Sequence, residues 1–176
     1  MKKLFKISSI LIGLVIVFAF VNPEKKVNKL VSKVWKNQEV SLSTLEVPDT
    51  LAAEITSLNT VYKDDEIVGY ACYATAFGCR IGGCAAATKG NLQSYDTFDY
   101  IVIYDENLSI LKVDIANYSG EYGYEICRPR WLTQFIGSTL GFELGENIDG
   151  ISGATVSATF LIEDLNGLGK LIKEII

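Results

Sequence analysis

Two pairs of β-rich segments limit the folds open to this chain of 176 residues. Each pair surrounds a short acidic turn: 58–63 and 66–75 around Asp64-Asp65, and 98–104 and 109–118 around 105–107. Such pairs are typical of β-hairpins, whose strands run antiparallel. In the last segment Leu111, Val113 and Ile115 alternate with polar residues, which predicts a strand with one buried face.

Helical patterns follow the strands. Residues 131–140 and 154–165 have helical spacing, and the pattern resumes over 170–176 after an interruption at Gly167 and Gly169. Hairpins followed by helices differ from the βαβ alternation of a parallel sheet. We therefore predict an α+β fold, with a mostly antiparallel sheet, packed helices and a preceding N-terminal membrane helix.

The N-terminus has the pattern of an export segment. Lys2, Lys3 and Lys6 precede the apolar stretch 7–21, which stops at Asn22-Pro23. This stretch accounts for much of the 49% apolar content. No A-x-A pattern follows it, so we expect residues 1–22 to remain as an uncleaved anchor; a cleaved signal is the alternative.

Residues 23–39 are predicted to form a basic amphipathic linker helix. Val27, Leu30, Val31 and Val34 share one helical face, with lysines elsewhere around it. Two interpretations remain open: a helix lying on the bilayer surface, or a helix packed on the domain formed by residues 40–176.

The chain contains no histidine. It therefore has no Ser-His-Asp or Cys-His catalytic unit, no histidine-ligated zinc and no haem with a histidine axial ligand. We expect any redox chemistry to come from a cofactor, with no catalytic side chain and no metal site in the chain itself.

Charge divides the chain into two parts. Residues 1–36 hold eight lysines and one glutamate, which leaves 8 basic and 20 acidic residues in 37–176, a formal charge of −12. Nucleic-acid binding needs clustered cations on phosphates, so nucleic acid is not an expected partner. The acidic body suits either docking to a basic protein or solubility alone.

Residues 149–155 read Asp-Gly-Ile-Ser-Gly-Ala-Thr and precede a predicted helix. Small residues let the backbone approach an anion, and the free N–H groups of a first helical turn point toward it. The helix dipole stabilises an anion at this position by about 0.3–1 kcal/mol. The alternative is a plain helix cap with Ser152 as N-cap, in which Asp149 accepts backbone N–H groups.

The complete string resembles the flavinylation motif, Asp-Gly-x-Ser/Thr-Gly-Ala-Thr, of the FMN-binding domain family. This domain occurs in the G subunit of the Rnf complex and the C subunit of the sodium-pumping NADH:quinone reductase. The similarity extends over residues 66–166. It implies that a flavin transferase of the ApbE type moves FMN from FAD onto Thr155 as a phosphoester. It further implies that Asp149, Ser152, Gly153 and Ala154 form the cofactor turn.

A second stretch resembles the Glu-containing loop of this family. Relatives in the ion-pumping complexes usually have Glu-Thr-Pro-Gly, where this chain has Glu121-Tyr122-Gly123-Tyr124. Glu121 is therefore a candidate cofactor contact. Tyr122, Tyr124 and Trp131 are candidates for aromatic contacts with the flavin ring, with core packing as the alternative for each.

Four cysteines, Cys72, Cys79, Cys84 and Cys127, are present. In an exported chain they predict structural disulfides, and the spacing of Cys79 and Cys84 suits a local bridge that leaves Cys72 to pair with Cys127. Free buried thiols and a redox-active dithiol remain as alternatives.

These observations predict a membrane-anchored, extracytoplasmic electron carrier with FMN on Thr155. Its expected partners are the flavin transferase, redox proteins such as a membrane electron-transfer complex, and the membrane itself. Two other functions remain open: an exported non-redox binding or structural module, and a flavin-dependent reductase of a small extracellular substrate.

Overall fold

The computed structural model describes residues 22–36, 38–47, 55–80 and 95–175. The predicted anchor lies outside these ranges except for Asn22. Among the helices in the described ranges, none has the length and apolar character needed to cross a bilayer.

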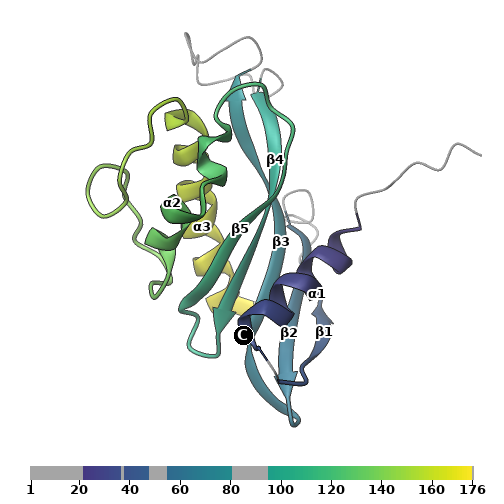
Figure 1. Cartoon of the computed structure of the whole chain (residues 1–176). Coiled ribbons are helices and arrows are strands. Elements are labelled where there is room, and N and C mark those ends of the chain that lie inside the picture. The colour runs from purple at the N-terminus through teal and green to yellow at the C-terminus, as the bar shows by residue number, and fades with distance from the viewer. Residues whose placement is uncertain (1–21, 37, 48–54, 81–94, 176) are drawn as a thin grey trace, which may run out of the picture.

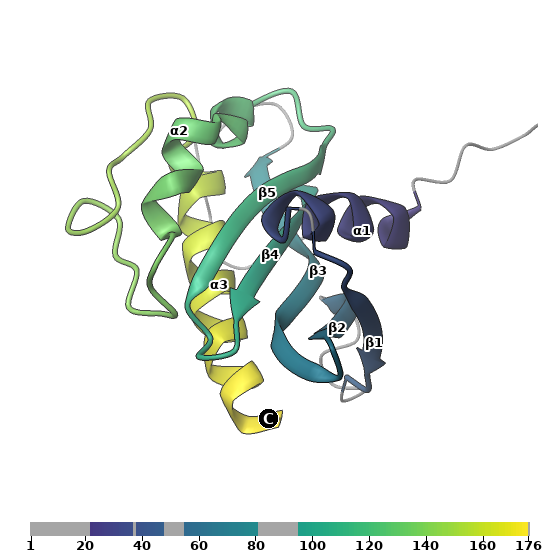
Figure 2. The same cartoon turned by 60° about the horizontal axis from the view of Figure 1, so that its bottom comes forward.

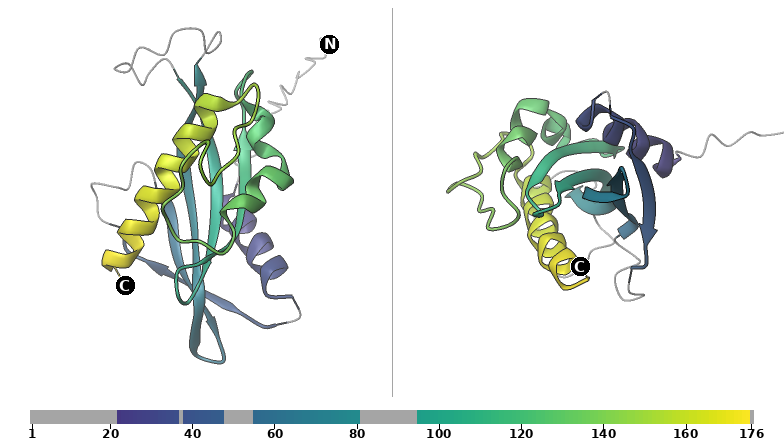
Figure 3. Two further views of the ribbon diagram at one scale, coloured as in Figure 1. Left: turned by 90° about the vertical axis from the view of Figure 1, so that its left-hand side faces the viewer. Right: turned by 90° about the horizontal axis from the view of Figure 1, so that it is seen from below.

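Within the described ranges, five strands form one sheet in which every neighbouring pair is antiparallel and the spatial order follows the sequence. They are β1 (Ser41–Leu45), β2 (Ile55–Lys63), β3 (Glu66–Arg80), β4 (Tyr95–Asp105) and β5 (Ile110–Tyr118). The α+β class and the antiparallel sheet are thus confirmed. Figure 1 shows the strands running side by side, and the end-on view in Figure 3 shows that the sheet is curved.

Both predicted hairpins form. Asp64 and Asp65, with φ of 50° and 65°, make the tight turn that pairs Lys63 with Glu66. Left-handed φ at two central residues is typical of turns whose twist matches that of the flanking strands. In the second hairpin, the carboxylate of Asp105 accepts the backbone N–H groups of Asn107 at 2.9 Å and Ser109 at 2.8 Å.

The predicted alternation in β5 is wrong at one residue. Val113 and Ile115 pack on the core beneath the last helix, whereas Leu111 packs on the opposite face of the sheet. The register explains this difference, because Ile103 pairs with Lys112 and Tyr104 with Ile110, which leaves Leu111 as an extra residue. A bulge of this kind disturbs the two-residue period of a strand.

Helices cover both faces of the sheet. The helix α1 (Pro23–Val34) covers one face, and α3 (Thr155–Ile175) covers the other together with η2 (Tyr124–Cys127), α2 (Pro129–Leu132) and η3 (Thr133–Phe135). We call these the α1 face and the α3 face. The arrangement is visible in Figures 1 and 2.

The apolar stripe of α1 is buried against the sheet. Val27, Leu30 and Val31 pack on residues of β2, β3 and β4, and Lys26 Nζ donates a hydrogen bond to the Ala116 carbonyl at 2.5 Å. Of the two interpretations for this segment, packing on the domain is therefore the one found. Helix α1 ends at Val34, five residues before the predicted boundary at 39.

The second predicted helix is shorter than expected. Helical structure ends at Phe135 instead of continuing to Leu140. Gly137 has a φ of 86° and donates its N–H to the Ile110 carbonyl at 2.8 Å, while the Ser138 carbonyl accepts from Ile110 at 3.0 Å. These two hydrogen bonds hold the chain beside β5 and end the helix.

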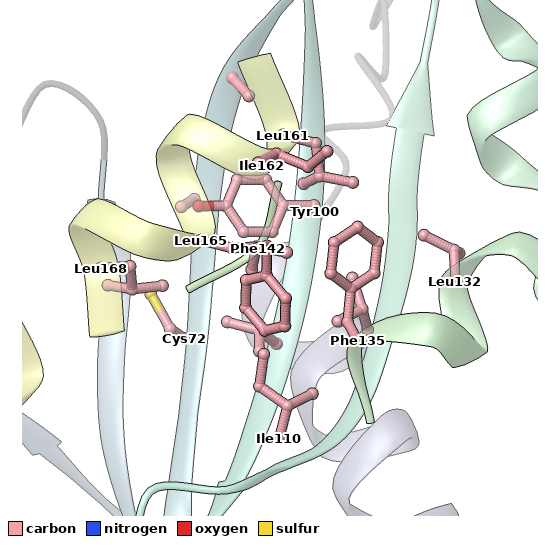
Figure 4. Packing of buried hydrophobic residues seen from close by; sticks show 14 of the residues in the cluster. Cys72, Tyr100, Ile110, Leu132, Phe135, Phe142, Leu161, Ile162, Leu165 and Leu168 are labelled. Atoms are coloured by element: carbon pink, nitrogen blue, oxygen red, sulfur yellow. The ribbon is translucent and has the colours of Figure 1, made fainter. Parts of the chain in front are cut away.

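The predicted interruption of the last helix is absent, because α3 is continuous through both glycines. Gly169 serves close packing: a Cβ there would lie 2.6 Å from the Thr139 carbonyl oxygen. Gly167 faces open space. In Figure 4, Leu161, Ile162, Leu165 and Leu168 of α3 pack near Tyr100, Phe135 and Phe142, which are part of one large core.

Candidate functional site

The predicted cofactor turn lies where α3 begins. Thr155 is the first residue of this helix, and the start of α3 lies near the end of β3 and the beginning of β4 (Figures 1 and 3). Phe160 fixes this end of the helix, with its ring centroid 5.6 Å from that of Phe77 and 5.4 Å from that of Tyr95. The motif is therefore placed by a long helix and the sheet beneath it.

The turn itself is built by Gly153. Its φ of 86° lies in the left-handed region, and the Ala154 N–H that follows donates to the Ile151 carbonyl at 3.2 Å. A side chain at such a φ is strained, which explains glycine here. Ala154 is fully buried, and its carbonyl accepts the Ala158 N–H at 2.9 Å.

The N-terminus of α3 has no side-chain cap. Ala154 occupies the position before the first helical residue and offers no oxygen, while Ser152 is exposed two positions further out. The alternative that Ser152 is the N-cap is therefore wrong. In the described part of the chain, the N–H groups of Thr155, Val156 and Ser157 find no acceptor. Three such donors at the positive end of a helix favour an anion.

Thr155 is exposed at this uncapped end. Its hydroxyl makes no hydrogen bond within the described ranges, and its carbonyl accepts from Thr159 Oγ1 at 2.9 Å. The hydroxyl is therefore both accessible and adjacent to the free N–H groups. These are two properties that an attachment point for a phosphate group needs.

Glu125 approaches the turn from η2. A Cβ built on Gly153 would lie 3.1 Å from Glu125 Oε1 and 3.4 Å from Oε2. Oε2 is buried and has no hydrogen-bond partner in the described structure. A buried carboxylate oxygen without a donor is rare in folded proteins, and here it lies beside the turn.

A hydroxyl pair holds this loop against α3. Tyr118 OH lies 3.0 Å from Ser157 Oγ and also donates to the Tyr122 carbonyl. Between them lies Gly123, where a Cβ would be 2.3 Å from Ser157 Oγ and where φ is 89°. The close approach and the backbone conformation both require glycine at this position, two residues before Glu125.

The other end of the motif is fixed by α2 and η3. Trp131 Nε1 donates to the Asp149 carbonyl at 2.8 Å, and the Asp149 N–H donates to Gln134 Oε1 at 2.8 Å. The Asp149 side chain is exposed and accepts no hydrogen bond from the described residues. Its backbone orients the turn, and the alternative in which its carboxylate accepts backbone N–H groups is wrong.

A cavity of about 470 Å³ lies beside these hydrogen bonds. It is lined by Arg128, Arg130, Trp131, Thr133, Gln134, Asp149 and Ile151. One lining residue, Ile151, accepts the Ala154 N–H with its carbonyl and so belongs to the turn that precedes Thr155.

The predicted aromatic contacts have different environments. Trp131 is buried, and its ring packs edge-on against Phe135 with centroids 5.2 Å apart. Tyr122 and Tyr124 are 43% and 58% exposed, so core packing is not their role. Glu121 is also exposed and forms no hydrogen bond with the described residues. The carboxylate that reaches the motif belongs instead to Glu125.

The predicted disulfide between Cys72 and Cys127 does not form. Cys72 is a buried free thiol and Cys127 a half-buried one, so they do not pair with each other. Burial raises the pKa of both thiols, and for Cys127 the nearby Asp114 and Glu125 carboxylates raise it further. Cys84 lies outside the described residues, and its bridge to Cys79 stays a prediction.

The donors and acceptors around the turn fit an FMN phosphate arm. The uncapped N–H groups suit a phosphate, and the unpartnered oxygen of Glu125 suits a hydroxyl donor such as those of a ribityl chain. The cavity supplies space for a ligand, and the guanidinium groups of Arg128 and Arg130 line it. A free phosphate ion would use only the uncapped N–H groups.

Sequence reasoning missed six residues of this site: Tyr118, Glu125, Arg128, Arg130, Gln134 and Ser157. A signal for one of them exists, since Glu125 follows Glu121 by four residues in the same glycine-containing loop. The two arginines also stand out in a body with only 8 basic residues. The Tyr118–Ser157 contact joins residues 39 positions apart and leaves no local sequence signal.

The whole chain was also compared with known proteins. No protein-family model matches the sequence, and no curated protein matches it significantly.

Proposed function

We propose that this protein is an extracytoplasmic electron carrier with FMN attached covalently to Thr155. The observation that carries the proposal is the uncapped start of α3, where an exposed threonine hydroxyl stands beside three N–H groups without acceptors. The sequence motif over residues 149–155 and the unpartnered Glu125 oxygen lend it further support.

Attachment would proceed by group transfer from FAD. A flavin transferase would join the Thr155 oxygen to the FMN phosphorus, break the bond between the two phosphates of FAD and release AMP, with the hydroxyl proton passing to the transferase. The N–H groups of Val156 and Ser157 would hold the phosphate in place. The positive end of α3 stabilises its negative charge by about 0.3–1 kcal/mol.

The bound flavin would supply reversible transfer of one or two electrons. The chain's own residues would position it: the Gly153 turn presents Thr155, and the Tyr118–Ser157 pair holds Glu125 against that turn. The proposed partners are the transferase and redox proteins, such as a membrane electron-transfer complex. The proposed location is the outer side of the cell membrane, with residues 1–22 as anchor.

Two valine substitutions test the attachment. The full chain is produced together with a flavin transferase, and intact mass and in-gel flavin fluorescence are measured for Thr155→Val and Thr159→Val. Both changes remove one threonine hydroxyl from the first turns of α3 and keep the side-chain shape. We expect the native chain and Thr159→Val to gain one FMN less one water, and Thr155→Val to gain none.

Equal flavin loading in the two variants would contradict attachment at Thr155. A native chain without any mass gain would contradict the flavoprotein function itself and favour the non-redox module. A loaded chain that oxidises a small substrate without a redox partner would instead favour the reductase.

A further inference from the structure

Arg128 and Arg130 are unusual in their surroundings. Residues 37–176 carry a formal charge of −12, and the potential of such a body opposes the gain of a further negative charge. Yet both arginines line a cavity that includes two residues of the motif, Asp149 and Ile151. The exposed Asp149 carboxylate lines the same cavity, so the lining carries two formal positive charges and one negative charge. This local excess of positive charge partly offsets the potential of the acidic domain.

Two hydrogen bonds hold the cavity wall on the side of the motif. Trp131 and Gln134 hold both backbone groups of Asp149 at 2.8 Å. Pro129 begins α2 directly between the two arginines, both of which are exposed. Ile151 lines the cavity and accepts the Ala154 N–H, so the cavity and the attachment point are joined by one hydrogen-bonded turn.

The chemistry of the lining suits a partly apolar ring with polar edges. Trp131 and Ile151 supply apolar surface, while Gln134 and the two guanidinium groups supply hydrogen-bonding groups. The volume of about 470 Å³ lies in the ordinary range for small-molecule sites.

We propose that this cavity receives the isoalloxazine ring of the flavin carried on Thr155, and that Arg128 and Arg130 stabilise its reduced anion. This inference rests on the proposed function. When dithionite is the reductant, it supplies two electrons and is oxidised to sulfite, and water supplies a proton to N5 of the ring. The negative charge that remains near N1 and the C2 carbonyl is then placed beside the guanidinium groups, which raises the midpoint potential.

The test compares two double variants of the flavinylated full chain. Arg128→Gln/Arg130→Gln removes two charges at the cavity, and Lys170→Gln/Lys173→Gln removes two exposed charges near the other end of α3. The midpoint potential is measured against reference dyes, and the flavin load is measured by intact mass. We expect the arginine variant to have a clearly lower potential than the lysine variant, and Arg128→Lys/Arg130→Lys to keep most of the native value.

A second measurement needs no variant. Acrylamide quenching of the flavin fluorescence reports whether the ring is shielded, and we expect weaker quenching than for free FMN. Equal potentials in the arginine and lysine variants, or quenching as strong as that of free FMN, would overturn the ring position while leaving the attachment intact. Absence of flavin on the native chain would instead refute the proposed function.

Discussion

Glu125 holds its carboxylate against Gly153, so closely that a Cβ on the glycine would lie 3.1 Å from Oε1. This contact joins the loop after β5 to the turn before α3, two segments that are distant in the sequence. It also leaves a buried carboxylate oxygen without a donor beside an uncapped helix. The geometry of the proposed FMN site therefore depends on a residue without a side chain at position 153.

Gly153→Ala is expected to destabilise the protein by about 1–3 kcal/mol, because a side chain at a φ of 86° is strained and the added methyl group crowds Glu125. Urea unfolding measures the change. Gly150→Ala is the matched control, since a Cβ at Gly150 meets nothing within 4 Å. If the two alanine variants have the same free energy of unfolding, the turn does not have the conformation described.

The contact between Tyr118 and Ser157 is expected to stabilise the loop that carries Glu125. Tyr118→Phe removes the hydroxyl that reaches both Ser157 Oγ and the Tyr122 carbonyl, at an expected cost of about 0.5–1.5 kcal/mol. A double-mutant cycle with Ser157→Ala isolates the shared part of this energy. Strictly additive effects of the two substitutions would show that the hydroxyl groups do not interact.

Tyr104 carries a buried hydroxyl without a hydrogen-bond partner in the described structure. A buried hydroxyl without a hydrogen-bond partner lowers the free energy of unfolding by about 1–3 kcal/mol. Tyr104→Phe keeps the ring and removes the hydroxyl, so we expect it to raise the free energy of unfolding by about 1 kcal/mol. The exposed Tyr124→Phe serves as control and is expected to change nothing; a loss of stability in Tyr104→Phe would mean that its hydroxyl has a partner.

Stability is expected to fall at alkaline pH. Burial raises the pKa of Cys72, Tyr100 and Tyr104 in the folded state. In the unfolded chain these groups ionise near their ordinary values, about 8.5 for the thiol and about 10 for the phenols. Above those values the folded state binds more protons than the unfolded chain, so the free energy of unfolding falls as pH rises.

Urea unfolding at about pH 7 and about pH 10.5 checks this dependence. The native protein should lose stability between the two pH values, and Tyr104→Phe should lose less because it lacks one of the ionising groups. A free energy of unfolding that is constant over this range would contradict the buried, neutral state of these side chains.

The cysteines should differ in their reaction with iodoacetamide. Cys127 is half-buried and its pKa is raised, so at neutral pH it should react more slowly than free cysteine, while Cys72 should react only after unfolding. Peptide mass spectrometry with and without urea identifies the labelled residues. The predicted bridge between Cys79 and Cys84 requires these two to react only after reduction. Native labelling of Cys72 would contradict its burial.

The sequence predicted the hairpins because strand alternation and turn chemistry are local signals. Asp64 and Asp65 adopt left-handed backbone angles that acidic turn residues tolerate, and the strands they join pair as expected. The strand β1 was missed because its side chains are mostly exposed and show no alternation. Leu111 was placed on the wrong face because a bulge depends on the register of the partner strand.

Several features of the structure depend on tertiary contacts and could not be predicted from local sequence patterns. The helix predicted over 131–140 ends early because Gly137 and Ser138 bond to Ile110 on β5. The glycines that predicted a break in α3 instead allow the Thr139 carbonyl to approach Gly169. For the site, the sequence predicted the position of Thr155 at a helix start, whereas the approach of Glu125 depends on contacts between distant segments.

The residue that carries flavin can be identified directly by mass spectrometry. Trypsin digestion of the full chain, produced with a flavin transferase and FAD, is followed by fragmentation of the peptide 131–170. Thr155 has competitors in this peptide, among them Thr133, Ser152 and Thr159. We expect an added FMN phosphoester on Thr155 alone. Flavin on another residue, or a peptide without flavin, would contradict covalent attachment at Thr155.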